Sequence, residues 1–398
     1  MKITYTAPNR SHHYPYAEAL HRAGYLHAFI SGFSRFSPRA ALPGVGDKLK
    51  RHDFFQNLYL ASLKFNTGPF ISSKFNHLTN LSLDKASYKS AKESDAFIFY
   101  RTEGYTTTQR LKKEKSKTVC IMEEVNSHVD HQYAILQEEY VKLGLGNYPE
   151  KIPDHATRLK AYEISDYILC PSEFVRQSFI DKGFSPKRLL KVNFGFSATS
   201  PVANKSFNTE SFRVLYVGQL NFRKGLRYAI EAFKQVKHPN KEFIIVGPKV
   251  GITGLEKMQL PKEVVFTGTL KGEELNDQYR KADVFILPSL EEGLALVQME
   301  ALSFGVPVLI TTNTGGEDII TDGGQGFIVP PADANALKER LQEMAGDKEL
   351  LKRMSEEALQ AAHSYGSWDL AVKRLADLLI PIIHPDKIYN ARYDSVYK

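Results

Sequence analysis

The chain is poor in cysteine and in long apolar runs, and both shortages limit what it can be. Cys120 and Cys170 are its only cysteines among 398 residues, and each closes a short apolar run. Two buried thiols are therefore expected, rather than a disulfide or a metal site. No stretch approaches the roughly 18 apolar residues of a membrane-spanning helix, and the first residues lack the apolar core of a secretory signal. We expect a cytoplasmic protein.

Acidic residues are scarce in the first half of the chain. Residues 1–200 carry 28 Lys and Arg against 19 Asp and Glu, whereas residues 201–398 carry 24 against 26. One interpretation is a solvated, lysine-rich surface. The other is a surface that meets an anionic partner, such as a membrane leaflet or a phosphate-bearing acceptor. Zinc-finger spacings, RNA-binding signatures and basic heptads are missing, so no nucleic-acid partner is predicted.

Within that half, the segment 33–65 combines basic and aromatic side chains. They are Arg35, Arg39, Lys48, Lys50, Arg51, Phe36, Phe54, Phe55 and Tyr59. This combination suits a membrane interface or a lipid-linked acceptor, and it would place the protein peripherally on the inner face of the membrane. An ordinary surface loop and helix is the alternative.

Short apolar segments alternate with helical patterns along most of the chain, which is typical of α/β domains with parallel sheets. Strands are predicted at 2–6, 96–100, 117–122, 167–170, 190–193, 212–217, 242–246, 264–267, 284–287, 306–310 and 326–329. The polar, aperiodic segment 197–211 is the best linker. We predict two Rossmann-like, doubly wound domains facing each other across a cleft, at 1–196 and 212–364. The C-terminal helices at about 365–398 are expected to pack back on the first domain.

The most informative motif holds two glutamates, Glu292 and Glu300, after the predicted strand at 284–287. The pattern that follows predicts a helix over 293–304, which Gly305 ends. Eight residues of such a helix span roughly 12 Å, about the reach from the sugar to the ribose of a nucleotide-sugar. A carboxylate suits a ribose diol, because two hydroxyl donors meet two acceptor oxygens.

A second motif places Arg223 and Lys224 in the turn between a strand and an amphipathic helix. Two cations beside the free N–H groups of a helix start suit a diphosphate. Two exposed turn residues are the alternative. The predicted helix after Glu292 would offer free N–H groups as well, and Gly293 permits close approach to the backbone.

Together these motifs resemble the signature of the group 1 retaining glycosyltransferases, which use nucleotide-sugars and have the GT-B architecture. The resemblance covers roughly residues 165–345 in order and spacing, and the first 160 residues much more loosely. Its motifs are Pro288-Ser289, Glu292-Gly293, Glu300-Ala301, Gly305-Val306-Pro307-Val308, Val217-Gly218, Lys224-Gly225, Ile245-Val246-Gly247, Gly315-Gly316, Asp322-Gly323 and Gly326-Phe327-Ile328-Val329-Pro330.

The resemblance implies roles for the matched positions. Lys224 would hold the donor diphosphate, and Glu300 would bind the ribose hydroxyls. Glu292 would contact the transferred sugar or support the developing charge. The backbone N–H groups of Gly293 and Leu294 would meet phosphate or sugar. The full predicted donor site is Gly218, Arg223, Lys224, Gly293, Leu294 and Glu300.

The chain departs from the family pattern at Gln219, Arg223 and Ala295. The family usually has arginine at the position of Gln219 and an acidic residue at that of Arg223. The cation is therefore displaced by four residues, and Arg223 would preserve the charge that meets phosphate. Ala295 replaces the family's second loop glycine, and its methyl group can narrow the sugar pocket.

In the first half, His128 follows the predicted strand at 117–122 and should face the cleft. The resemblance implies that it touches the donor sugar; His131 and a plain packing role are the alternatives. The predicted acceptor-side residues follow the first strand, where many relatives have a glycine-rich loop that this chain lacks. They are Asn9, Arg10, His12 and His13.

We predict a hexosyltransferase that moves a sugar from a UDP- or GDP-sugar to a hydroxyl of a glycan or lipid-linked acceptor. The anomeric configuration would be retained, and the product would be a cell-surface polysaccharide or glycoconjugate. The predicted catalytic residues are Glu292, His128, Lys224 and Arg223. No carboxylate is clearly placed as a nucleophile, so the resemblance favours a front-face route. In that route the cations stabilise the leaving diphosphate, which helps to deprotonate the acceptor.

An Asp-x-Asp metal motif is missing, so no metal and no cofactor are expected. A nucleotide-sugar-binding protein without turnover is one alternative function. A glycan phosphorylase or disaccharide synthase of the same architecture is another. Hydrolysis fits poorly, because glycosidase carboxylates act about 5–10 Å apart across one bond.

Overall fold

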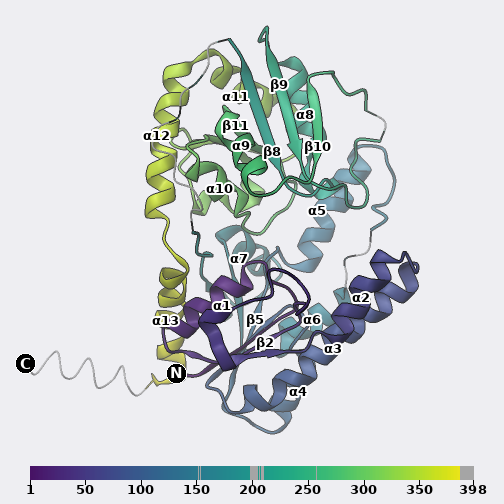
Figure 1. Cartoon of the computed structure of the whole chain (residues 1–398), viewed down its shortest axis with the longest axis vertical. Coiled ribbons are helices and arrows are strands. Elements are labelled where there is room, and N and C mark those ends of the chain that lie inside the picture. Colours follow the sequence, from purple (N-terminus) through teal and green to yellow (C-terminus); the bar gives the residue numbers. More distant parts are fainter. Residues whose placement is uncertain are drawn as a thin grey trace, which may run out of the picture.

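The computed structural model of the chain contains two α/β domains. The first lies at the bottom of Figure 1 and the second at the top. It describes residues 1–150, 152, 154–197, 205, 207, 210–256 and 258–385. Most of the predicted linker, 197–211, lies outside the described residues, as does the end of the C-terminal segment. No described helix has both the length and the apolar character needed to cross a membrane.

The first domain is built on a sheet of seven parallel strands in the order β3-β2-β1-β4-β5-β6-β7. The strands are β1 (Ile3–Ala7), β2 (Leu26–Ser31), β3 (Leu49–Arg51), β4 (Ala96–Tyr100), β5 (Val119–Glu123), β6 (Tyr167–Cys170) and β7 (Leu189–Lys191). Its helices are α1 (His13–Arg22), α2 (Phe54–Lys64), α3 (Pro69–Lys92), α4 (Tyr105–Lys113), α5 (Val129–Lys142), α6 (His155–Ile164) and α7 (Glu173–Ile180).

The second domain has six parallel strands in the order β10-β9-β8-β11-β12-β13. They are β8 (Phe212–Val217), β9 (Lys241–Val246), β10 (Val264–Gly268), β11 (Val284–Leu287), β12 (Val308–Thr311) and β13 (Gly326–Val329). The helices are α8 (Leu226–Gln235), α9 (Glu273–Lys281), α10 (Val297–Ser303), α11 (Ala334–Gly346), α12 (Lys348–Ser364) and α13 (Trp368–Ile383).

The predicted pair of doubly wound parallel sheets is confirmed. A parallel strand covered by helices on both faces is apolar throughout, and β11 follows this rule because all four of its residues are fully buried. The eleven predicted strands are present, whereas β2 and β3 were missed. The core-facing residues of β2 follow a turn at Gly24, which has φ +75°, and this turn was its sequence signal.

The chain passes between the domains twice, and the two passages touch. α12 packs on the second domain, whereas Trp368, Val372 and Leu375 of α13 belong to the core of the first. The Phe196 N–H, just before the linker, donates to the carbonyl of Gly366 at 3.2 Å. A Cβ atom at Gly195 would overlap the backbone of Trp368, so the two passages are in direct contact.

Each sheet has one point where the strand order reverses, between β1 and β4 in the first and between β8 and β11 in the second. Ligands of such sheets bind in the crevice beyond the carboxyl ends of the strands at this switch point. The loop after β5 contacts the loop after β11. The carboxyl ends of the two sheets therefore face each other, and the two crevices are the expected ligand-binding sites.

Candidate functional site

At the switch point of the second sheet, the loops after β8 and β11 are bound to each other. The Leu290 N–H donates to the Arg223 carbonyl at 2.8 Å. Gly225 has φ +62°, and a Cβ atom there would overlap the carbonyl oxygen of Pro288, so only glycine fits. This close contact brings the side chains of Lys224 and Glu292 together.

Four charged side chains form a cluster between these loops. The Lys224 ammonium pairs with the Glu292 carboxylate. Arg223 Nη1 lies 3.1 Å from Glu292 Oε2 and 3.3 Å from Glu291 Oε2. All four side chains are at most 19% exposed. Because they are largely buried, Arg223 and Lys224 are not exposed turn residues. The cluster contains two cations and two carboxylates, so an incoming diphosphate would have to replace a glutamate as the partner of one cation.

The cluster shifts the pKa values of Glu292 and Lys224. Burial acts to raise the pKa of Glu292, but Arg223 and Lys224 outweigh it and hold that pKa at about 2. Burial lowers the pKa of Lys224, with Glu292 opposing the shift. Glu292 is therefore ionised at neutral pH and is unsuited to act as a general acid. It is suited to accept hydrogen bonds from hydroxyls.

Glu300 lies apart from this pair. Its Oε2 accepts a hydrogen bond of 2.9 Å from the hydroxyl of Tyr279 on α9, and that ring stacks on Phe304. Burial raises the pKa of Glu300, and the Tyr279 hydroxyl only partly offsets it. Glu300 stands in the first turn of α10. The predicted two turns of helix between the glutamates are therefore wrong, and the separation of 12 Å no longer follows from helix geometry.

The start of α10 differs from the prediction, whereas its end does not. The helix begins at Val297, so Gly293 and Leu294 lie before it in a loop. A Cβ atom at Gly293 would overlap the carbonyl oxygen of Val125, and the Gly293 carbonyl accepts a hydrogen bond of 2.6 Å from Ser172 Oγ. These contacts with the first domain hold the loop out of the helix. Gly305, with φ +66°, ends the helix as predicted.

Other predicted donor residues are engaged within the protein. Gly218 follows β8, and its N–H donates to the Val246 carbonyl at 2.9 Å. Leu294 and Ala295 are buried. Gln219 lines a cavity of about 250 Å³ between the domains, together with Arg223. Arg223, the cation displaced by four positions, thus lines the same cavity as Gln219, which stands where the family usually has arginine.

Glu291 is a functional candidate that the sequence did not reveal. It is fully buried and accepts hydrogen bonds of 2.9 Å from both the N–H and the hydroxyl of Ser127. A third bond of 2.7 Å comes from Gln132 on α5. Its neighbour Glu292 was its only signal. Because these partners belong to the first domain, Glu291 joins the two domains directly beside the charged cluster.

Among the described residues, no hydrogen bond or ion pair joins His128 to the cluster, and its contact with the donor sugar stays a prediction. Its Nδ1 accepts a hydrogen bond of 3.1 Å from the N–H of Asp130 and so caps α5. Its ring packs against Tyr162 and Phe179, and burial lowers its pKa to about 4. These contacts favour the packing alternative for His128. Burial lowers the pKa of the nearby His131, with a smaller raising effect from the charge of Glu291.

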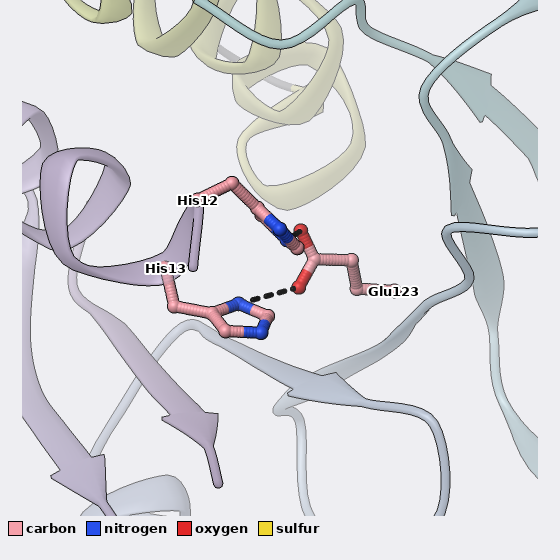
Figure 2. Close-up of side chains that lie close together, drawn as sticks. All are labelled: His12, His13 and Glu123. Carbon is pink, nitrogen blue, oxygen red and sulfur yellow. Dashed lines mark hydrogen bonds and ion pairs between the residues drawn. The ribbon is translucent and has the colours of Figure 1, made fainter. Parts of the chain in front are cut away.

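His12 and His13 converge on Glu123 at the end of β5 (Figure 2). His12 Nε2 lies 3.1 Å from Glu123 Oε1, and His13 Nδ1 lies 3.5 Å from Oε2, which also accepts a hydrogen bond of 2.8 Å from Tyr5. Burial acts to raise the pKa of Glu123, but both histidines hold it below its usual range. Burial, the largest effect, lowers the pKa of His13 to about 4.

Among the described residues, this trio can be considered for a metal ion, because its ligand atoms lie within 4.8 Å of one another. However, His13 Nε2 is buried without a hydrogen-bond partner. A metal-ligating histidine normally donates its second N–H to a polar group. The hydrogen bonds of His12 with Glu123 and of His13 with the Tyr5 hydroxyl account for the trio better than a metal ion does.

The predicted acceptor-side residues separate in the structure. Asn9 lines a cavity of about 310 Å³ at the switch point of the first sheet. Arg10 instead donates to the backbone carbonyls of Arg39 and Ala41. His12 and His13 are occupied with Glu123. Of the four predicted residues, Asn9 alone lines this cavity.

Comparisons with known proteins place this geometry in context. Residues 202–361 match the family model described as glycosyl transferases group 1. A sulfoquinovosyl transferase of Arabidopsis thaliana is 29% identical over 232 residues, which are 54% of this chain and 44% of that protein. A putative colanic acid biosynthesis glycosyltransferase, WcaL of Salmonella typhimurium, is 33% identical over 144 residues, 33% of this chain and 36% of that protein. The chain thus spans less than half the length of these curated relatives.

Solved structures share the fold. Sucrose-phosphate synthase from Thermosynechococcus elongatus superposes with a TM-score of 0.66 at 18% identity, over 97% of this chain and 100% of that one. HepE of Anabaena, in complex with UDP-glucose, gives a TM-score of 0.64 at 16% identity, over 95% and 99% of the two chains. The predicted GT-B architecture is therefore confirmed.

Proposed function

We propose that this chain, which belongs to the group 1 glycosyl transferases through residues 202–361, moves a sugar from a nucleoside diphosphate to a hydroxyl of an acceptor. The observation that carries the proposal is the pairing of Arg223 and Lys224 with Glu291 and Glu292 at the switch point of the second sheet. The Anabaena neighbour binds UDP-glucose, which supports a UDP-sugar as the first donor to try, with GDP-sugars second.

The donor would bind by exchange of partners within the cluster. A diphosphate would take the Lys224 ammonium from Glu292, and the freed carboxylate would accept hydrogen bonds from the sugar hydroxyls. Glu300 would exchange the hydroxyl of Tyr279 for the ribose diol. Arg223 is held by the backbone carbonyl of Glu291 at 2.7 Å and would stay in place beside the phosphates.

Transfer would then depend on stabilising the leaving diphosphate. Lys224 and Arg223 are preorganised cations in a water-poor site, where such stabilisation is strongest. Glu292 is a weak nucleophile, because its low pKa marks a carboxylate stabilised by two cations. We therefore favour retention through a front-face route, with the cations replacing a metal ion.

The test is a thermal-shift screen followed by a turnover assay. We expect either UDP or GDP to raise the melting temperature of the full chain, because a ligand that binds only the folded state stabilises it. The matching nucleotide-sugar should then release nucleoside diphosphate, at a rate that a chelator leaves unchanged. Donor binding without release would favour the binding-protein alternative. Release that requires inorganic phosphate would favour a phosphorylase, and the absence of any shift would contradict the donor site.

The acceptor, we propose, is a glycan or lipid-linked sugar met on the cytoplasmic side of an anionic membrane, in polysaccharide or glycoconjugate synthesis. The support comes from the hairpin of α2 and α3, at the outer side of the first domain in Figure 1. Residues 54–83 contain no acidic side chain. The hairpin exposes large apolar side chains around two lysines. They are Leu60, Leu63, Lys64, Phe65, Phe70, Ile71 and Lys74.

Flotation with phosphatidylglycerol vesicles tests this contact. We expect the chain to co-float at low salt and to dissociate partly at high salt, because surface charges are screened. Replacing Phe65 and Phe70 by serine should abolish flotation without unfolding, since they are 74% and 82% exposed. Val141→Ser, at a residue 54% exposed on α5, is the matched control and should float like the parent. Failure of the parent chain to float at low salt would remove the membrane proposal.

A further inference from the structure

The cavity lined by Asn9 has the position of a ligand site. Asn9 follows β1 and Glu103 follows β4, so the cavity opens where the strand order of the first sheet reverses. That is where doubly wound sheets bind their ligands. Its volume of about 310 Å³ is at the lower end of the range for small-molecule pockets.

The described residues of the cavity walls are polar, and each of the two arginines among them pairs with Glu124. Four amide side chains line it, and amides can donate to and accept from hydroxyl groups. They are Asn9, Gln56, Asn76 and Asn80. Of the two arginines in the wall, Arg158 is bound to the buried Glu124 at 2.7 Å. Arg101 donates to Asn126 at 2.7 Å and lies 3.6 Å from Glu124. Such walls favour a neutral ligand rich in hydroxyls over a phosphate.

Apart from Arg101, whose Nε also lacks a hydrogen bond, Glu103 is the group in the described wall that lacks a partner. It is 4% exposed, and its Oε2 is buried without a hydrogen bond. Burial raises its pKa to about 8, with smaller raising effects from Asp154 and Asp84 and a lowering effect from Arg101. A buried carboxyl oxygen without a partner is costly. A hydroxyl of a bound ligand would supply the missing hydrogen bond.

The backbone next to Glu103 is strained. Arg101 has φ +50°, a left-handed conformation that costs free energy for a side chain of this size. Residues held in this way concentrate at binding and catalytic sites. Arg101 and Arg158 also line the cavity between the domains, to which Arg223 contributes. The two cavities are therefore neighbours. A ligand in the cavity of the first sheet would lie next to the cavity between the domains, which Arg223 of the charged cluster lines.

We propose that the cavity at the switch point of the first sheet binds the acceptor as a neutral, hydroxyl-rich sugar ring, with the Glu103 carboxyl bonded to one of its hydroxyls. The rings of Tyr59 and Tyr100 in the same wall suit the apolar face of a sugar. The identification of this sugar as the acceptor rests on the proposed function, whereas the binding of a neutral sugar does not.

Saturation-transfer NMR on the full chain, without donor, tests the binding. The probes are the methyl glycosides of glucose, galactose, mannose and N-acetylglucosamine, together with glucose 6-phosphate. At least one neutral glycoside should bind, and more tightly than the phosphate. Glu103→Leu should weaken that binding by about tenfold or more, the scale of one lost hydrogen bond to a buried group. Glu103→Gln keeps a hydrogen-bonding group and should weaken it less.

A second variant covers the event that Glu103→Leu does not fold. Gln56→Leu, on α2 in another wall, should also weaken binding, whereas Gln177→Leu, on the exposed side of α7, should not. The proposal is overturned if no neutral glycoside binds, if glucose 6-phosphate binds more tightly, or if folded wall variants bind like the parent. Glycoside binding that depends on Glu103 in a chain that binds no nucleotide would support the cavity and contradict the proposed function. Donor turnover, together with folded wall variants that bind the glycoside like the parent, would support the proposed function and contradict the cavity proposal.

Discussion

Lys224→Ala is expected to lower kcat for sugar transfer by about two to three orders of magnitude, the usual effect of removing one preorganised group that stabilises developing charge. The leaving diphosphate would keep Arg223 alone, because no other cation of the cluster faces it. The measurement is release of nucleoside diphosphate at saturating donor. Donor affinity should fall as well, since Lys224 also meets the diphosphate before transfer.

Lys249→Ala is the matched control, since this lysine belongs to the same domain and its side chain is 65% exposed. It should leave kcat and donor affinity unchanged. Thermal melting of both variants separates a lost contact from a lost fold. A Lys224→Ala protein that turns over within about threefold of the parent would refute the role given to the cluster.

Glu291→Leu is expected to destabilise the chain by about 3–5 kcal/mol, the cost of removing one partner from a buried ion pair. Arg223 would lose a carboxylate, and Ser127 and Gln132 would lose the acceptor that ties the first domain to the second. Glu291→Gln should cost less, because an amide oxygen can still accept. The measurement is the denaturant midpoint, combined with the radius of gyration in solution, which should increase as the domains separate.

Glu274→Leu, an exposed glutamate on α9, is the comparison and should change neither quantity. If Glu291→Leu, like Glu274→Leu, changed neither the denaturant midpoint nor the radius of gyration, other groups would have to hold the domains together. A loss of stability without a change of dimensions would place the role of Glu291 within the second domain alone.

The strands were predictable because their pattern is local. In β11 the run of four apolar residues already implies a strand covered on both faces, and no other part of the chain is needed to interpret it. β3 was missed because it has only three residues, none of them fully buried. The apolar residues of β2, after the turn at Gly24, form an equally local pattern.

The errors in the candidate site came from contacts between distant parts of the chain. Lys224 and Glu292 are 68 positions apart, and their pairing depends on how two loops meet. The helical pattern at 293–304 is real, but hydrogen bonds and close packing with the first domain hold Gly293 outside the helix. His128 was predicted from its place after a strand, and its neighbours on α6 and α7 could not be inferred from that place.

The contact between the two chain passages limits how this molecule can open. Two bodies joined by a single flexible segment can swing in any direction, whereas two adjacent joints define one axis. Because Phe196 is bonded to Gly366, and Gly195 lies against Trp368, we expect the domains to turn about a line through these residues and to slide or twist little. Donor entry and product exit would then follow one opening motion. The hydrogen bonds of Glu291 with Ser127 and Gln132, on the cleft side, would break and re-form in each cycle.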